Sequence, residues 1–183
     1  MNNPNMKIIT QTSRLIIREF KPEEEHLFLD IDGDDQLTKY IPKRTVQESK
    51  QVFAKTLGEY TNTSGLGRWG IFNHEDTDFI GVCFLKPSEY DQNRIELGYR
   101  FHVKYWGSGM ATELAKAVVA YGFDQVKLQE INAVTHPDNA ASQRVLSKVG
   151  FKYYSDVFWY NEMVPLFKIN KAEKNSDLAG ITY

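Results

Sequence analysis

The sequence predicts an α+β protein with α/β/α layers, in which helices flank one mixed, mostly antiparallel sheet of about seven strands. Short aliphatic runs of strand length alternate with polar turns, and one stretch between two such runs carries apolar residues at helical spacing. A strand–helix–strand order of this kind makes its two strands parallel. The chain of 183 residues fits one domain, expected over residues 8–170, with a polar tail over 171–183.

The first half of the chain predicts one strand, two helices and a hairpin. Residues 13–20 form the strand, and an acidic start favours a helix over 23–33. Thr45 and Glu48 have the spacing of a capping box that opens the second helix. That helix is expected to bury Val46, Phe53, Ala54 and Leu57. The hairpin pairs 68–74 with 78–86.

The second half predicts the parallel pair of strands and a closing hairpin. The parallel strands are 94–101 and 130–135, and the closing hairpin pairs 151–160 with 163–170. A helix begins after Gly109, and another lies between Asn139 and Gly150. Asp138 or Asn139 can cap this last helix, and Gly150 is placed to end it. It is expected to bury Ala141, Val145 and Val149.

Composition excludes several classes of function. A net charge of -2 argues against a partner bound by phosphate neutralisation, so no nucleic acid is expected. No apolar run approaches the ~20 residues of a membrane helix, and residues 1–5 start no signal peptide. The single cysteine, Cys83, forms no internal disulfide, which is compatible with a cytoplasmic protein. The four histidines lack ligand spacing, so no metal is expected.

The glycine turn at Gly107 and Gly109 precedes a helix and is a candidate anion site. Helix N-termini carry free N–H groups and partial positive charge, which attract phosphate. The two glycines remove side chains that would hold a phosphate away. The spacing is neither a P-loop nor a dinucleotide fingerprint, and a tight turn without a ligand is the alternative.

Two motifs together resemble the GNAT superfamily of acetyl-CoA-dependent N-acetyltransferases. One is Trp106-Gly-Ser-Gly-Met-Ala111, and the other is Asn139-Ala-Ala-Ser-Gln-Arg-Val-Leu-Ser-Lys-Val-Gly-Phe151. Residues 12–23 resemble the opening of the branch typified by RimJ and RimL, the ribosomal-protein N-terminal acetyltransferases. The resemblance implies the GNAT fold, with a splayed parallel pair of strands, and acetyl-CoA as cosubstrate.

The resemblance also implies the cosubstrate site. Pantetheine would follow the strand 94–101 and bond to main-chain groups near Phe101 and Val103. Asn139 and Ser142 would line the other wall. The pyrophosphate would lie on main-chain N–H groups of Gly107, Ser108, Gly109, Met110, Ala111 and Thr112.

The sequence departs from the superfamily pattern in two places. Trp106 stands where Arg or Gln is usual, and this aromatic is typical of the RimJ/RimL-like branch. Leu146 occupies the position where many relatives place a tyrosine that protonates the leaving thiolate. Ser142 is our candidate for that catalytic acid, because a hydroxyl can donate a hydrogen bond to the departing sulfur. The alternative is a helix hydroxyl that only packs or bonds to the backbone.

Glu96 is the candidate catalytic base, acting directly or through a water. Strand alternation places it on the opposite face from Ile95 and Leu97. The alternative is a strand residue that is exposed or paired with Arg94 or Arg100. An α-amine with a pKa of about 7.7–8.0 needs far less help to deprotonate than a lysine at about 10.4. We expect Glu96→Gln to lower kcat/KM most at low pH.

The predicted function is acetyl transfer to a primary amine, either a protein N-terminus or a small molecule. A non-catalytic acyl-CoA sensor on the same fold is the alternative. The acidic run from Asp30 to Asp35 could favour cationic amines or could be a solvated loop. Aromatic residues in 151–160 could serve a homodimer.

Overall fold

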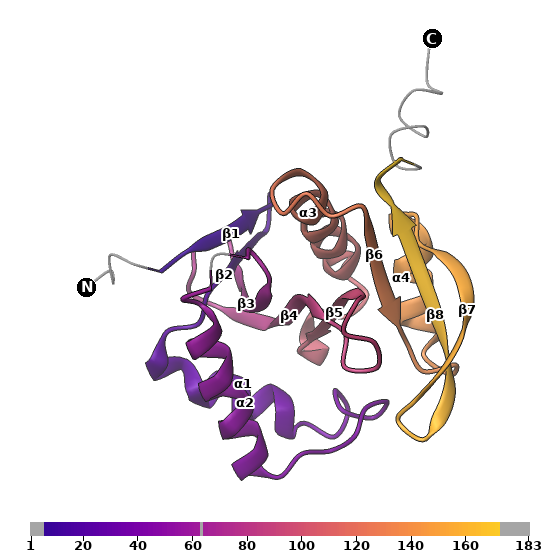
Figure 1. The fold of residues 1–183 in the computed structure, drawn as a ribbon. Coiled ribbons are helices and arrows are strands. Elements are labelled where there is room, and N and C mark those ends of the chain that lie inside the picture. The colour runs from indigo at the N-terminus through magenta and orange to yellow at the C-terminus, as the bar shows by residue number, and fades with distance from the viewer. Residues whose placement is uncertain (1–5, 63, 173–183) are drawn as a thin grey trace.

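One eight-stranded sheet runs through the protein in the order β1-β2-β3-β4-β5-β6-β8-β7, as the computed structural model in Figure 1 shows. The structure describes residues 6–62 and 64–172. The strands are β1 (Ile8–Gln11), β2 (Leu15–Arg18), β3 (Gly67–Asn73), β4 (Phe79–Pro87), β5 (Ile95–Phe101), β6 (Glu130–Val134), β7 (Lys152–Trp159) and β8 (Glu162–Asn170). The helices are α1 (Glu25–Gly33), α2 (Val46–Glu59), α3 (Met110–Asp124) and α4 (Ala140–Val149). The predictions for residues 1–5 and for most of the tail fall outside the described residues.

The predicted mixed sheet and its parallel pair are confirmed. Neighbouring strands are antiparallel except β5 and β6, which are parallel and share a single register pair, Glu96 with Asn132. All the other neighbouring strands pair over several residues. The two parallel strands therefore splay apart beyond this pair. Strand β1, at the sheet edge, was not predicted and brings the strands to eight.

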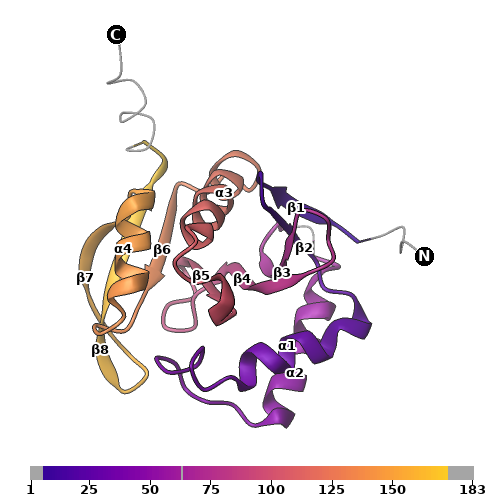
Figure 2. The ribbon, with the colours of Figure 1, turned by 180° about the vertical axis from the view of Figure 1, so that it is seen from behind.

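Two hydrophobic clusters on opposite faces of the sheet produce the predicted layers. Val82 of β4 packs with Phe28 of α1 and Phe53 of α2. Its neighbour Cys83 points to the other face, into the cluster that contains Leu114 of α3. Successive strand residues face opposite sides, so one strand supplies both cores. Figure 2 shows α1 and α2 together, well separated from α3 and α4.

Helix starts were predicted well, and helix faces only in part: Phe53 of α2 is buried as expected. The Thr45–Glu48 capping box forms, with Thr45 Oγ1 accepting from the Glu48 N–H at 3.2 Å. The predicted burial of Val46, Ala54 and Ala141 is wrong. Val46 is 67% exposed, Ala54 and Ala141 are also exposed, and in α4 the buried residue is Leu146 instead. Which face of a helix is buried depends on where it docks, and helix spacing leaves that open.

None of the helices within residues 6–62 and 64–172 is long and apolar enough to cross a membrane. Strand β7 forms one edge of the sheet. Its Tyr153, Tyr154 and Phe158 side chains are exposed, each by more than half. The homodimer suggested for this segment stays a prediction.

Candidate active site

A cavity of about 180 Å³ lies where β5 and β6 part. Its lining includes Glu96 and Arg100 from one face of β5 and Leu97 and Tyr99 from the other. A cavity that reaches both faces of a strand passes through the gap beside it. On the other side of this gap, the cavity is lined by Asn139, the N-cap of α4, and by Ser142 and Leu146 of that helix. The structure thus brings together both predicted catalytic residues, Glu96 and Ser142.

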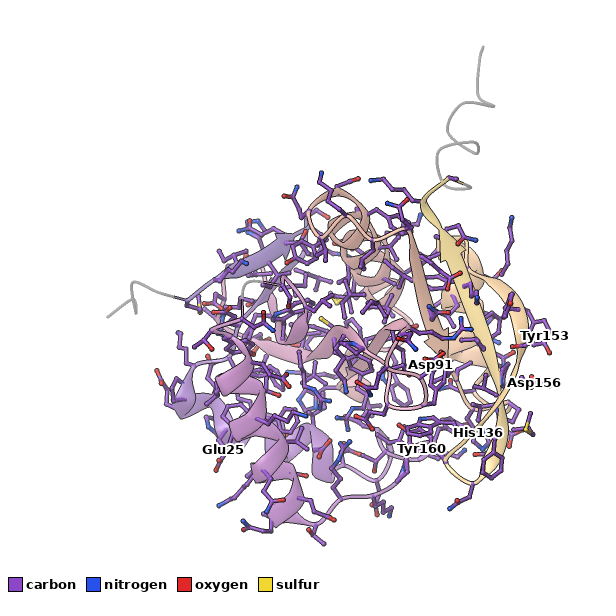
Figure 3. The ribbon with its side chains drawn as sticks, in the orientation of Figure 1. Glu25, Asp91, His136, Tyr153, Asp156 and Tyr160 are labelled. Atoms are coloured by element: carbon purple, nitrogen blue, oxygen red, sulfur yellow. The ribbon has the colours of Figure 1, made fainter. Side chains whose placement is uncertain are left out.

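Two segments distant in sequence close one end of the cavity. The loop after α1 contributes Tyr40, whose ring lies 4.8 Å from that of His136. The Tyr40 hydroxyl also donates to the Asp138 carbonyl at 3.4 Å. The turn of the β7–β8 hairpin contributes Tyr160. Figure 3 shows His136 and Tyr160 near this hairpin turn, and both line the cavity.

Glu96 projects from β5 opposite Lys86 of β4 and accepts a hydrogen bond of 2.6 Å from the Ser88 hydroxyl. Burial raises the pKa of Glu96 to about 7, although Ser88 and the charge of Lys86 oppose the shift. A carboxyl with this pKa exchanges protons near neutrality. The alternative of a pairing with Arg94 or Arg100 is wrong. Arg94 bonds to Asp91 at 2.9 Å, and Arg100 bonds to Asp32 at 2.6 Å.

Asn139 and Ser142 are positioned by the start of α4. Asn139 caps the helix, its side-chain oxygen accepting from the Ser142 N–H at 3.1 Å. Pro137 precedes this cap and prevents β6 from continuing. The Asn139 amide is therefore engaged in capping, while Ser142 faces the cavity.

Tyr99 is a site residue that sequence reasoning missed. Its hydroxyl is buried beside that of Ser142 and has no well-formed hydrogen bond to the described residues. Burial raises the pKa of Tyr99 to about 12, with Ser142 acting in the opposite direction. Tyr99 is thus a proton donor that stays protonated at neutral pH. Its only sequence signal was a lone polar atom on the strand face shared with Leu97 and Phe101.

The glycine turn has the backbone geometry of an anion site. Gly107 and Gly109 have φ angles of +72° and +80°, and Gly109 is the N-cap of α3. Such angles are costly for residues with a Cβ atom. The first-turn N–H groups of Met110, Ala111 and Thr112 have no acceptor within the helix. The Ser108 hydroxyl is already engaged, donating to the Tyr105 carbonyl at 2.6 Å.

Phe101 and Val103 lie between the cavity and this turn, and Trp106 binds to both. The Trp106 indole N–H donates to the Phe101 carbonyl at 2.8 Å, and its main-chain N–H donates to the Val103 carbonyl at 3.0 Å. A carbonyl oxygen has two lone pairs, so each of these carbonyls can accept a further hydrogen bond. None of the predicted cofactor residues from 101 to 112 lines the cavity itself. The predicted site therefore consists of two parts, joined by the carboxyl end of β5.

Arg14 holds the turn in place and was also missed. Its Nη1 donates to the Ser108 carbonyl at 3.0 Å, and its Nε donates to Glu113 of α3 at 2.7 Å. The side chain is 42% exposed, so it places a cation beside the helix N-terminus. No local signal could have found it, because Arg14 and Ser108 are 94 positions apart in sequence.

Comparison with known proteins identifies the family of this chain. The pattern of the acetyltransferase (GNAT) domain matches residues 14–152. YoaA, an uncharacterized N-acetyltransferase of Bacillus subtilis, is 31% identical over 147 residues, which cover 79% of this chain and 82% of YoaA. The chain therefore belongs to the GNAT acetyltransferases. It is an acetyl-CoA-dependent N-acetyltransferase.

Solved structures share the fold. RimL, a ribosomal L7/L12 α-N-protein acetyltransferase solved with coenzyme A, superposes with a TM-score of 0.75 at 13% identity, covering 90% of this chain and 98% of RimL. Spermidine N-acetyltransferase from Vibrio cholerae, solved with CoA and spermine, has a TM-score of 0.72 at 16% identity, covering 88% and 98%. The same fold thus occurs in proteins named for protein and for polyamine acceptors.

A substitution in the glycine turn tests the phosphate site. Gly107→Ala should weaken CoA binding at least tenfold, because the added methyl group occupies the surface on which the phosphate would lie. A Cβ at Gly107 meets no atom within 4 Å, so the fold loses only the ~1–2 kcal/mol of left-handed strain. Calorimetric titration with CoA and urea unfolding measure the two effects. Gly58→Ala, in α2 and equally free of neighbours, is the control and should leave CoA affinity unchanged. Unaltered affinity in Gly107→Ala would remove this turn from the site.

Proposed function

We propose that the enzyme transfers acetyl from acetyl-CoA to a primary amine by direct attack in a ternary complex, with Glu96 as the base. One observation carries this proposal: the Glu96 carboxyl, with a pKa of about 7, lines the same cavity as Ser142. A base of that pKa suits proton removal from an ammonium group at neutral pH. The pantetheine arm would enter through the gap between β5 and β6, from Phe101 and the glycine turn.

Direct attack is favoured over an acetyl-enzyme intermediate. Cys83, the one cysteine of the chain, is fully buried in the core and does not line the cavity. Its burial raises the pKa of the thiol, which suppresses the nucleophilic thiolate. Alignment of the two substrates in one cavity can itself supply several kcal/mol. The acetyl carbonyl would be polarised by main-chain N–H near Phe101.

Release of free CoA thiol from acetyl-CoA tests the proposal. The panel contains peptides with different N-termini, amino acids, polyamines and aminoglycosides. Turnover with one class, with both substrates required together in initial-rate kinetics, is the expected result. Tight acetyl-CoA binding without turnover of any amine would contradict it and favour the non-catalytic sensor.

The departing thiolate receives a hydrogen bond from the Ser142 hydroxyl in this proposal. Ser142→Ala should lower kcat by about 10–100-fold, because a hydrogen bond to a charged group contributes about 1.5–3 kcal/mol. KM for acetyl-CoA should change little. Ser147→Ala, exposed on the same helix, is the control and should match the wild type. Tyr99→Phe is measured alongside, because its hydroxyl lies beside Ser142. A larger loss in Tyr99→Phe would assign the acid role to Tyr99.

A further inference from the structure

Three arginines line the cavity on the Glu96 side of the sheet: Arg44, Arg68 and Arg100. Strand register fixes their arrangement. Arg100 lies two positions beyond Gly98, and Gly98 two beyond Glu96, so all three face the same side. Arg68 of β3 is opposite Phe84, which is opposite Gly98. Gly98 has no side chain, and the Phe84 ring packs over it, so an apolar surface lies between the carboxyl group and the guanidinium groups.

The nearby carboxylates are already engaged. Asp32 accepts from Arg100 Nη2 at 2.6 Å, from Arg44 Nη1 at 3.3 Å and from the Ser49 hydroxyl at 2.5 Å. Burial opposes ionisation of Asp32, but these partners outweigh it and hold its pKa below the usual range. Glu89 binds Lys86 at 2.8 Å. The buried carboxylate of Asp32 is thus the anionic partner of two of the three arginines, Arg100 and Arg44.

Arg68 is left without an anionic partner. It is 7% exposed, and its guanidinium has no hydrogen bond or ion pair within the part of the chain that the structure describes. It lies 5.6 Å from the ring centres of both Phe28 and Phe84. Arg100 Nη1 is likewise buried without a hydrogen-bond partner among these residues. Buried cations without partners are costly, so such groups point to a ligand that completes them.

Electrostatics strengthen this reading of Arg68. Burial lowers its pKa to about 10, the neighbouring charges of Arg100 and Arg44 act in the same direction, and the charges of Asp32 and Glu89 oppose the shift without cancelling it. The cavity wall therefore has an excess of positive charge that an anion would relieve.

We propose that the acceptor amine carries a carboxylate on the same molecule, as an amino acid does, and that Arg68 and Arg100 bind this carboxylate while Glu96 faces the amine. The inference rests on the proposed function and names its substrate class. The backbone positions of Glu96 and Arg100 are ~13 Å apart along the strand, and both side chains line the same cavity. A cavity of about 180 Å³ suits a small molecule. Arginine pairs with carboxylates through two parallel hydrogen bonds.

Three members of the acidic run, Asp32, Asp34 and Asp35, do not supply a competing cation site. Asp32 is bound to arginines, Asp35 pairs with Lys43 at 2.6 Å, and Asp34 accepts from the Gln36 N–H at 2.8 Å. Asp32 is therefore not available to bind a cationic amine. It does not belong to a solvated loop either, because its side chain is only 1% exposed.

The experiment compares amino acids with their amides in the thiol-release assay. L-alanine, L-glutamate and L-phenylalanine are each paired with the α-amide, and spermidine and a peptide with an acidic N-terminal residue are included. The amine of an amino acid amide is less basic than the amine of the free amino acid. A preference for the free amino acid therefore cannot come from easier deprotonation of its amine. We expect kcat/KM at least tenfold higher for the acids. Preference for the acidic peptide would also support a carboxylate site, with a side chain as its source.

Arg68→Met tests the assignment. It should lower kcat/KM for the preferred acid at least tenfold and remove the preference over the amide. Without ligand it should melt at a higher temperature than the wild type, because an unpaired buried cation is gone. The same amino acid should raise the melting temperature of the CoA-bound wild type but not of CoA-bound Arg68→Met. Lys55→Met, on the exposed face of α2, is the matched control and should behave as wild type.

The outcomes separate this inference from the proposed function. Amides or spermidine acetylated as well as the acids would overturn the carboxylate site and leave acetyl transfer intact. An unchanged acid preference in Arg68→Met would overturn the role of that residue. Failure of every amine, together with failure to bind acetyl-CoA, would overturn the proposed function and this inference with it.

Discussion

Glu96→Gln should lower kcat/KM for amine acetylation by about 10²-fold at pH 6, because general-base assistance of this kind contributes at least that much. Gln keeps the size and can still accept from the Ser88 hydroxyl, which bonds to Glu96 at 2.6 Å. Positional effects should therefore be small. Thiol release at saturating acetyl-CoA measures the loss. Glu75→Gln, in the exposed β3–β4 turn, is the control.

The pH dependence identifies the base. In the wild type, kcat/KM should rise with pH until Glu96 is ionised, near its pKa of about 7. In Glu96→Gln it should rise until the acceptor amine itself is neutral. The ratio of the two is therefore largest below pH 7 and shrinks above it. An amine of different pKa should move the break in the variant alone. Identical profiles for both proteins would remove Glu96 from the base role.

The same variant should be more stable than the wild type at pH 8. The folded pKa of about 7 lies above the ordinary value of 4.5, so the folded state binds the extra proton between these values. Stability of the wild type therefore falls as pH rises through this window, and the full penalty, about 3 kcal/mol, remains above it. Urea unfolding should show a higher unfolding free energy for Glu96→Gln than for the wild type at pH 8. At pH 4.5 this difference should disappear. A gain of equal size at both would contradict the raised pKa.

Arg18→Met should cost about 3–5 kcal/mol of unfolding free energy, the usual result of breaking a buried ion pair. Arg18 is 1% exposed and donates to both oxygens of Glu24, at 2.9 and 2.7 Å, and to Asp76 at 2.7 Å. Its guanidinium also lies 3.5 Å from the Phe72 ring centre. The substitution leaves the Glu24 carboxylate, 9% exposed, without its cation. The melting temperature should fall by roughly 6–20 °C.

Low pH and a second substitution separate charge from packing in this variant. Burial opposes ionisation of Glu24, but its bonds to Arg18 outweigh this and lower its pKa. The wild-type pair thus stabilises above the ordinary pKa of a glutamate, and this contribution is lost as pH falls through the lowered value. The gap between wild type and Arg18→Met should therefore narrow in acid, and Glu24→Gln added to it should restore part of the stability. Lys50→Met, which breaks an exposed pair with Glu25, should cost less than about 1 kcal/mol. A loss that neither acid nor Glu24→Gln reduces would assign the effect to packing.

Local signals accounted for most of the fold. The Thr45 cap, the Asn139 cap and the left-handed glycines at Gly109 and Gly150 depend on residues within a few positions, so they could be predicted from sequence. The parallel pair follows from the strand–helix–strand order. Strand β1 was missed because its four residues have a mixed pattern and their place in the sheet depends on pairing with β2.

The site was predicted where a motif carried it and missed where only folding assembled it. By itself the sequence determined the fold class and the glycine turn, because strand alternation and helix capping act over short distances, and its resemblance to the GNAT superfamily made Glu96 and Ser142 candidates. Only the tertiary structure decided that Glu96 binds Ser88 rather than an arginine, that Tyr99 lies beside Ser142, and that Arg68 lacks an anion. These facts depend on which side chains from separate strands and helices share one low-dielectric cavity, and no spacing along the chain specifies that.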